Sequence, residues 1–143
     1  MVNDGREALA RLLGADPGDW FVDFMKFGSG GHNPDDATEM GSVDVTDDDL
    51  YSVGGGGDWS HAGGEAYNFE YDVTSTTTWP SPLRKVQFEA TVEATEGNGA
   101  GTLEYSEAGL FYDSGTVMFA HKAFGYIVKN NTIKLVATWT FTF

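Results

Sequence analysis

The chain has 143 residues, of which 41% are hydrophobic, enough for one domain with a core of its own. It carries 22 Asp and Glu against eight Lys and Arg, a net charge of -14. Such a polyanion repels phosphates, which argues against nucleic acid or a membrane surface as a partner. Cysteine is absent, which excludes a disulfide framework and thiol catalysis.

The excess of acidic over basic residues has two interpretations. One is a well-solvated surface, and the other is adaptation to high salt. At molar salt the Debye length falls to roughly 3 Å, so dense carboxylates repel each other little and still hold water. The excess of acidic over basic residues favours a halophilic source.

The first 14 residues predict the only helix of the chain. Asn3 or Asp4 can cap its first turn, and Leu9, Leu12 and Leu13 form an apolar stripe. Such a short helix needs a surface on which to dock. No basic region followed by an apolar core is present here, so we expect no signal peptide.

Next comes a strand, predicted over residues 20–27 from the aromatic run "WFVDFMKF". Residues 28–65, rich in Gly and Asp, are predicted to be mainly loops. Within them, Thr46 or Asp47 can cap a single helical turn over residues 44–50.

From residue 66 to residue 143 the pattern predicts an antiparallel β core. Apolar residues alternate with polar ones over 67–73, over 85–95 after a connecting stretch, and over 133–143. A hairpin is expected over 106–124 with its turn at Asp113–Gly115, and further turns at 96–101 and at Asn130–Asn131. We therefore predict a single mainly β domain, an antiparallel β-sandwich or small barrel with one short N-terminal helix.

Catalytic motifs are lacking. His32, His61 and His121 show no metal-binding spacing, so they are interpreted as exposed or edge residues. No serine-nucleophile or phosphate-loop motif is present. Four glutamates in or near the strands could form a glycosidase pair, but in a chain with 22 acids such pairs arise by chance: Glu89, Glu93, Glu104 and Glu107.

Four aspartates, Asp44, Asp47, Asp48 and Asp49, are weak candidates for Ca²⁺ binding because that ion takes several hard oxygen ligands. They lack the spacing and the glycine of an EF-hand loop. A solvated acidic surface is the preferred interpretation, and we expect no metal, no cofactor and no enzymatic activity.

A closing strand of alternating aromatics is also typical of outer-membrane barrels. The strands are few, however, and other apolar faces hold small residues such as Ala90 and Ala94. This alternative is therefore set aside.

The order of features from residue 87 onward resembles small virion structural proteins of tailed viruses, related to tail-fibre and baseplate adaptor domains. In that group a glycine-bearing turn, a Glu-x-Gly-Leu-Phe strand, a Gly-x-(Leu/Met)-Phe-Ala strand, a lysine and a closing Trp-x-(Phe/Ile)-x-Phe recur. The matching positions are Gly97, Gly99, Glu107, Gly109, Leu110, Phe111, Gly115, Met118, Phe119, Ala120, Lys129, Trp139, Phe141 and Phe143.

The resemblance implies a non-enzymatic protein of a tailed virus, with the acidic balance pointing to a virus of a halophilic archaeon. It would be a tail-tip or baseplate component that anchors fibres, or a capsid turret component, located in the virion after assembly in the host cytoplasm. The expected partners are further copies, as a trimer, pentamer or hexamer, other virion proteins and possible host surface contacts. The glycine-rich loops 28–33 and 54–64 would face neighbours or solvent.

The aromatic and apolar residues include expected core positions and expected interface positions. Core positions are expected for Phe69, Phe88, Phe111 and Trp139. The interface candidates are Leu9, Leu12, Leu13, Trp20, Phe21, Trp59 and Trp79.

Two alternatives come from other classes of protein. A small carbohydrate-binding β-sandwich module would stack Trp59 and Trp79 on sugar rings and would be a monomer. A hydrolase would hold one glutamate with a raised pKa in a cleft.

Overall fold

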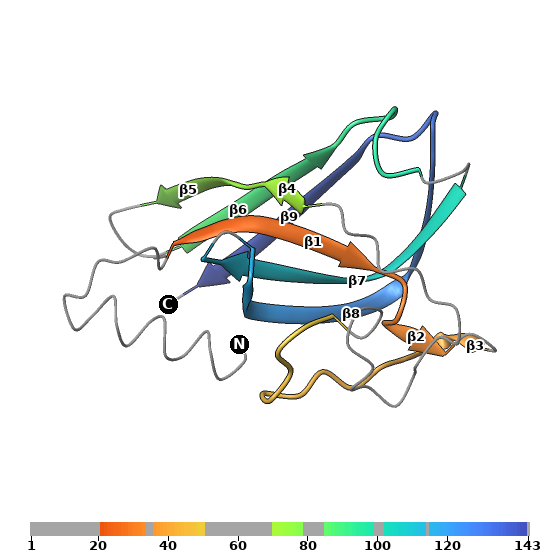
Figure 1. Ribbon diagram of the computed structural model, residues 1–143, viewed down its shortest axis with the longest axis horizontal. Helices are drawn as coiled ribbons and strands as arrows, with labels where there is room; N and C mark the ends of the chain where they lie inside the picture. The colour runs from red at the N-terminus through yellow and green to blue at the C-terminus, as the bar shows by residue number, and fades with distance from the viewer. Residues whose placement is uncertain are drawn as a thin grey trace.

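The computed structural model describes residues 21–33, 36–50, 70–78, 85–98, 102–113 and 115–142. The predicted helix over 1–14, the loop 54–64 and Phe69 lie outside these residues. In the described part the protein is mainly β, with antiparallel sheets (Figure 1).

The larger sheet has four strands in the order β4-β1-β7-β8. These are β4 (Glu70–Asp72), β1 (Val22–Gly28), β7 (Thr102–Tyr112) and β8 (Val117–Asn130). The predicted strand over 20–27 is confirmed as β1, and the predicted hairpin over 106–124 as β7 and β8. Between these two strands Asp113 and Gly115 have φ values of 54° and 75°, the left-handed backbone that such a turn requires.

The second sheet has three strands in the order β5-β6-β9: β5 (Thr74–Thr78), β6 (Lys85–Val92) and β9 (Leu135–Thr142). The pairing of β6 with β9 runs without a register shift from Lys85↔Thr142 to Val92↔Leu135. The alternation predicted for both strands is therefore confirmed. The stretch expected to be a connection contains β5, because threonine is well suited to a strand.

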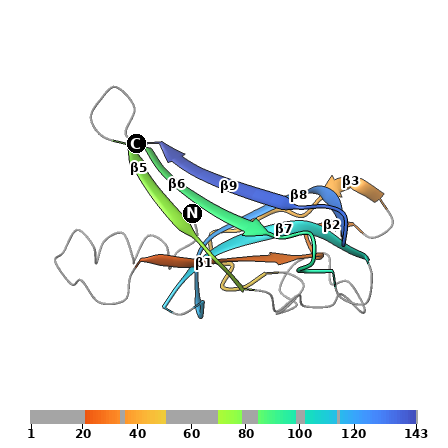
Figure 2. The same ribbon diagram turned by 90° about the horizontal axis from the view of Figure 1, so that it is seen from above.

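The core lies where the two sheets face each other, as Figure 2 shows from above. From β6, Phe88, Ala90 and Val92 are buried, as expected for Phe88. From the larger sheet, the Phe27 ring lies 5.4 Å from the Tyr105 ring between centroids. Trp139 of β9 packs against this core while remaining partly exposed. A smaller apolar cluster joins Phe111 to Leu50 and Met118.

The region predicted to be loops differs from that expectation. It contains a short hairpin, β2 (His32–Asn33) and β3 (Asp36–Met40), which lies beside β8 (Figure 1). The single helical turn over 44–50 does not form. Instead the Asp44 carboxylate accepts hydrogen bonds from the backbone N–H and the hydroxyl of Thr46, which closes a polar turn.

Candidate functional site

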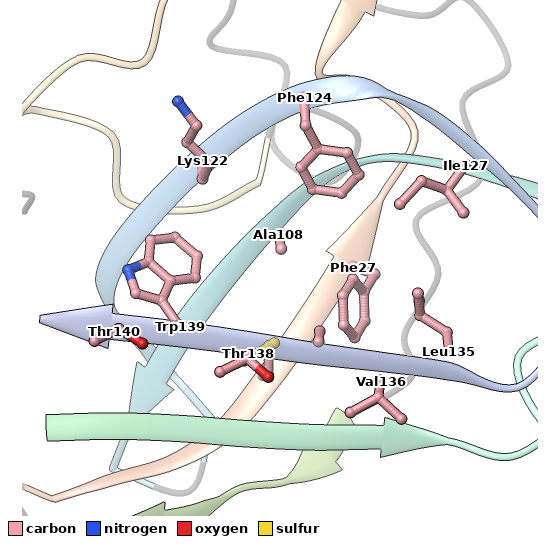
Figure 3. Close-up of a pocket in the computed structure, with 12 residues that line it drawn as sticks. Phe27, Ala108, Lys122, Phe124, Ile127, Leu135, Val136, Thr138, Trp139 and Thr140 are labelled. Carbon is pink, nitrogen blue, oxygen red and sulfur yellow. The ribbon is translucent and has the colours of Figure 1, made fainter.

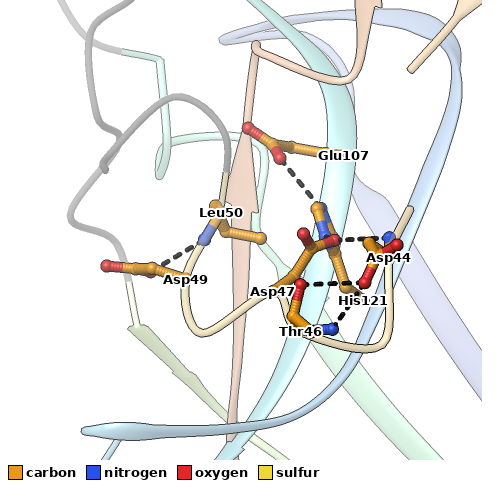
Figure 4. A network of polar contacts seen from close by, with 7 residues as sticks. All are labelled: Asp44, Thr46, Asp47, Asp49, Leu50, Glu107 and His121. Carbon is orange, nitrogen blue, oxygen red and sulfur yellow. Dashed lines mark hydrogen bonds and ion pairs between the residues drawn. The ribbon is translucent and has the colours of Figure 1, made fainter. Parts of the chain in front are cut away.

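Three titratable side chains meet on the face of the larger sheet that is turned towards residues 41–50 (Figure 4). The Nδ1 atom of His121 lies 3.0 Å from Oδ2 of Asp47, and its Nε2 atom lies 3.0 Å from Oε2 of Glu107. The side chains of His121 and Glu107 are fully buried, and that of Asp47 is 13% exposed. The imidazole thus bridges two carboxylates.

The turn that follows β1 is hydrogen-bonded to Glu107 and to the neighbouring Ser106. Glu107 Oε1 accepts a hydrogen bond of 3.0 Å from the Gly30 N–H, and Ser106 Oγ accepts one of 3.0 Å from the Gly31 N–H. Neighbouring residues of a regular strand face opposite sides of a sheet. The pairing of β7 with β8 shifts register between Tyr105 and Glu107, and this irregularity lets Ser106 and Glu107 both reach the turn.

Gly31 can hold this position only because it lacks a side chain. A Cβ atom there would lie 2.1 Å from the Ser106 carbonyl oxygen, which is backbone and cannot move aside. The residues 28–31 are buried. The expectation that the loop 28–33 faces outward was therefore wrong, because its backbone packs on β7.

The environment of His121 favours its charged form. Burial is the largest influence and opposes the charge, but the hydrogen bonds and charges of Glu107 and Asp47 together outweigh it and raise the pKa of His121. His121 is therefore buried rather than exposed, as His32 also is, although β8 does lie at an edge of its sheet. With both ring nitrogens occupied by carboxylates, the imidazole has no free atom for a substrate, so the cluster serves to attach residues 41–50 to the sheet.

A second buried cation holds the connection that follows β6. Lys129, fully buried on β8, donates through Nζ to oxygen atoms at distances of 2.8–3.3 Å, belonging to Glu93, Ala94, Glu96, Asn98 and Asn130. Tyr105 Oη donates to the Gly97 carbonyl, and Gly97 has the φ of 60° expected of a glycine-permitted turn. Burial lowers the pKa of Lys129, while the charges of Glu96 and Glu93 oppose that shift.

An apolar cleft of about 390 Å³ opens between β8 and β9 (Figure 3). In this view β8 arches over the cleft and β9 runs along its other side. The volume falls in the range of ligand pockets, ~300–1,000 Å³. The cleft is lined by Met25, Phe27, Ala108, Lys122, Phe124, Ile127, Leu135, Val136, Ala137, Thr138, Trp139 and Thr140.

The segment that supplies most of the lining of this cleft differs in charge from the rest of the sequence. All acidic residues lie at or before Asp113, whereas the segment after it contains Lys122, Lys129 and Lys134 and no acid. Large hydrophobic residues are exposed there in a group that we call the C-terminal apolar surface: Tyr126, Ile127, Val128, Ile133 and Val136. Composition alone did not draw attention to this surface, because the type of a residue does not show its exposure: Tyr126, Ile127 and Val128 are consecutive apolar residues of β8 and all three are exposed.

The other candidate residues do not converge on a site. Of the four aspartates, Asp44 binds Thr46, Asp47 turns inward to His121, and Asp49 accepts the Leu50 N–H. Within the described ranges no group of three or more His, Cys, Asp or Glu could hold a metal ion. Glu89, Glu93 and Glu104 are exposed, unlike Glu107.

Of the interface candidates, only Phe21 is described, and it is 65% exposed. The others, Leu9, Leu12, Leu13, Trp20, Trp59 and Trp79, lie outside the described residues. No helix in the part of the chain that the structure describes is long and apolar enough to cross a membrane.

Comparison of the chain with protein-family models, with curated proteins and with solved structures gives no significant match.

Proposed function

We propose that this chain is a non-enzymatic structural protein of a tailed-virus virion, acting in assembly as a homo-oligomer. In this proposal it is a tail-tip or baseplate component that anchors fibres, or a capsid turret component, of a virus with a haloarchaeal host. The finer fold we propose is an open sandwich of the two sheets, with the cleft at the edge where β8 and β9 part.

One observation carries the assembly role. A strongly acidic protein exposes five large hydrophobic residues in a segment that itself contains no acidic residue, next to an open apolar cleft. Exposed apolar residues beside an apolar cleft are a feature of protein interaction sites. Interface cores are depleted of charged residues in the same way.

The buried polar groups support a structural rather than a catalytic role. Asp47, His121 and Glu107 satisfy one another, and Lys129 is surrounded by oxygen acceptors. A general base needs a free atom within reach of a substrate, and His121 has none. The cleft is lined mainly by carbon atoms, and its polar lining consists of Thr138, Thr140 and Lys122. Such a lining suits an apolar partner better than a sugar.

The test is the solution mass of the purified protein, measured by light scattering at about 0.1 M and at molar salt. We expect a defined trimer, pentamer or hexamer at molar salt, where screening removes the repulsion between chains of charge -14. A folded monomer under both conditions would contradict the assembly role. Sugar binding by that monomer would then favour the carbohydrate-binding alternative.

A further inference from the structure

We infer that the cleft between β8 and β9 binds a carboxylate that carries a long hydrocarbon chain. The chain lies along the cleft, and the carboxylate lies at Lys122. The inference goes beyond the assembly role and does not depend on it, because it concerns a single copy of the protein.

The cleft exists because the two sheets join on one side and separate on the other. On the first side only Val73 separates β4 of the larger sheet from β5 of the smaller one. On the other side β8 and β9 are consecutive strands joined by residues 131–134, an arrangement that usually gives a hairpin. They nevertheless pair with different neighbours, and the space between the sheets opens between them (Figure 3). A concave, mostly apolar space of this size is the usual form of a small-molecule site.

The core residues beside this opening keep apolar area in water. On β6, Phe88 and Val92 are buried, whereas their register partners on β9, Trp139 and Leu135, are only half-buried. The cleft also reaches core residues such as Phe27, which is 2% exposed. A ligand that fills the cleft removes this apolar area from water, which favours binding roughly in proportion to the area covered.

The shape of the cleft suits one flexible chain. Its lining follows β9 from Leu135 to Thr140, a length of about 17 Å at ~3.3 Å per residue. Figure 3 shows Ile127 and Leu135 towards one end, and Lys122 and Trp139 towards the other. A volume of about 390 Å³ along this length forms a narrow apolar channel, which an extended hydrocarbon chain can occupy.

Lys122 supplies the charge that selects the head group. It pairs in register with the core residue Ala108, so its stem lies on the core-facing side of β8. Among the described residues that line the cleft, Lys122 is the only charged one. Its ammonium forms no ion pair within the described ranges, whereas Lys129 is surrounded by oxygen acceptors and Lys134 pairs with Glu93. Lys122 is therefore available to an anion.

The position of this ammonium fits an amphiphile. Figure 3 shows Nζ of Lys122 directed away from the interior of the cleft, so a carboxylate bound to it stays at the rim and keeps its contact with water. Such an exposed ion pair adds modestly to affinity, and the hydrocarbon chain supplies most of it. The net charge of -14 opposes an anion at long range, but at about 0.1 M salt charges more than about 10 Å apart are largely screened.

The experiment measures binding of decanoate to the full chain by isothermal titration calorimetry, at neutral pH and about 0.1 M salt. Two matched ligands separate the contributions: decan-1-ol has a chain of the same length without the charge, and hexanoate has the charge on a shorter chain. The wild type is expected to bind decanoate about a hundredfold more tightly than hexanoate. It should bind decanoate about threefold to fivefold more tightly than decan-1-ol.

Two lysine variants test the head-group site. Lys122→Met should abolish the preference for decanoate over decan-1-ol and retain the preference for the longer chain. Lys134→Met is the matched control, because it removes the same charge from a residue that does not line the cleft. It should retain both preferences.

A third variant tests the cleft itself. Ala137 lines the cleft and is half-buried, so Ala137→Leu fills part of the space and should weaken decanoate binding about tenfold or more. Circular dichroism establishes that each variant is folded. The inference is overturned if the wild type does not bind decanoate, if folded Ala137→Leu binds it equally well, or if Lys122→Met keeps the preference for the carboxylate. None of these results changes the expected solution mass, so the assembly role is tested separately.

Discussion

His121→Leu is expected to lower the free energy of unfolding by about 3–5 kcal/mol, the range found when one partner of a buried ion pair is removed. The change leaves the fully buried Glu107 carboxylate without its cation and releases Asp47 from the sheet. Urea denaturation at pH 6 measures the loss. Proteolysis within residues 41–50 should accelerate with it, because the contact to Asp47 attaches that segment.

Two controls separate the buried network from ion pairing in general. Lys134→Met removes a half-exposed pair with Glu93 and should cost less than about 1 kcal/mol. The double variant His121→Leu/Glu107→Gln removes the orphaned charge and should recover part of the loss. A cost of His121→Leu as small as that of Lys134→Met would contradict the role of the network.

The same network makes stability depend on pH. The folded-state pKa of His121 is raised, and the unfolded value is about 6.5. The contribution of His121 to the free energy of unfolding is therefore fully present below about pH 6.5 and is lost as the pH rises through the folded-state pKa. The free energy of unfolding of the wild type should therefore fall as the pH rises above about 6.5. The His121→Leu variant should not show this fall. Equal pH slopes for the two proteins would argue against a charged His121.

Lys129→Met is expected to cost about 3 kcal/mol, since hydrogen bonds to a charged group contribute roughly 1.5–3 kcal/mol each and several are lost together. Methionine preserves the apolar stem but leaves the oxygen atoms around residues 93–98 without their donor. Thermal denaturation measures the effect. The exposed Lys122 on the same strand is the control, and Lys122→Met should change stability by less than about 0.5 kcal/mol. Equal effects of the two changes would show that the buried ammonium does not organise the connection.

The parts of the fold that could be predicted are those governed by local pattern. In β6 and β9 alternate residues are apolar, and the structure buries or half-buries them and pairs the strands in register. The β7–β8 hairpin follows from two apolar runs around Asp113–Gly115. In each case residues adjacent in sequence contain the whole signal.

The polar network could not be predicted in this way. Asp47 and His121 are 74 residues apart in sequence, and Glu107 reaches the imidazole through a register shift in β7 that no local pattern marks. The hairpin β2–β3 was missed because its strands are short and polar and are bounded by Gly, Asn and Asp. Lys129 was singled out only as the lysine of the resemblance; most of its acceptors come from a turn more than 30 residues away.

The most direct test of the assembly surface is amide hydrogen exchange in β9, compared with β6, at an assembling concentration and after dilution, both at molar salt. If the C-terminal apolar surface is an interface, exchange in Leu135–Thr142 should be slow in the assembly and faster after dilution. Exchange in the central strand β6, which pairs on both sides within one chain, should change little. Equal exchange rates in β9 at both concentrations would contradict the proposal that the C-terminal apolar surface is an interface.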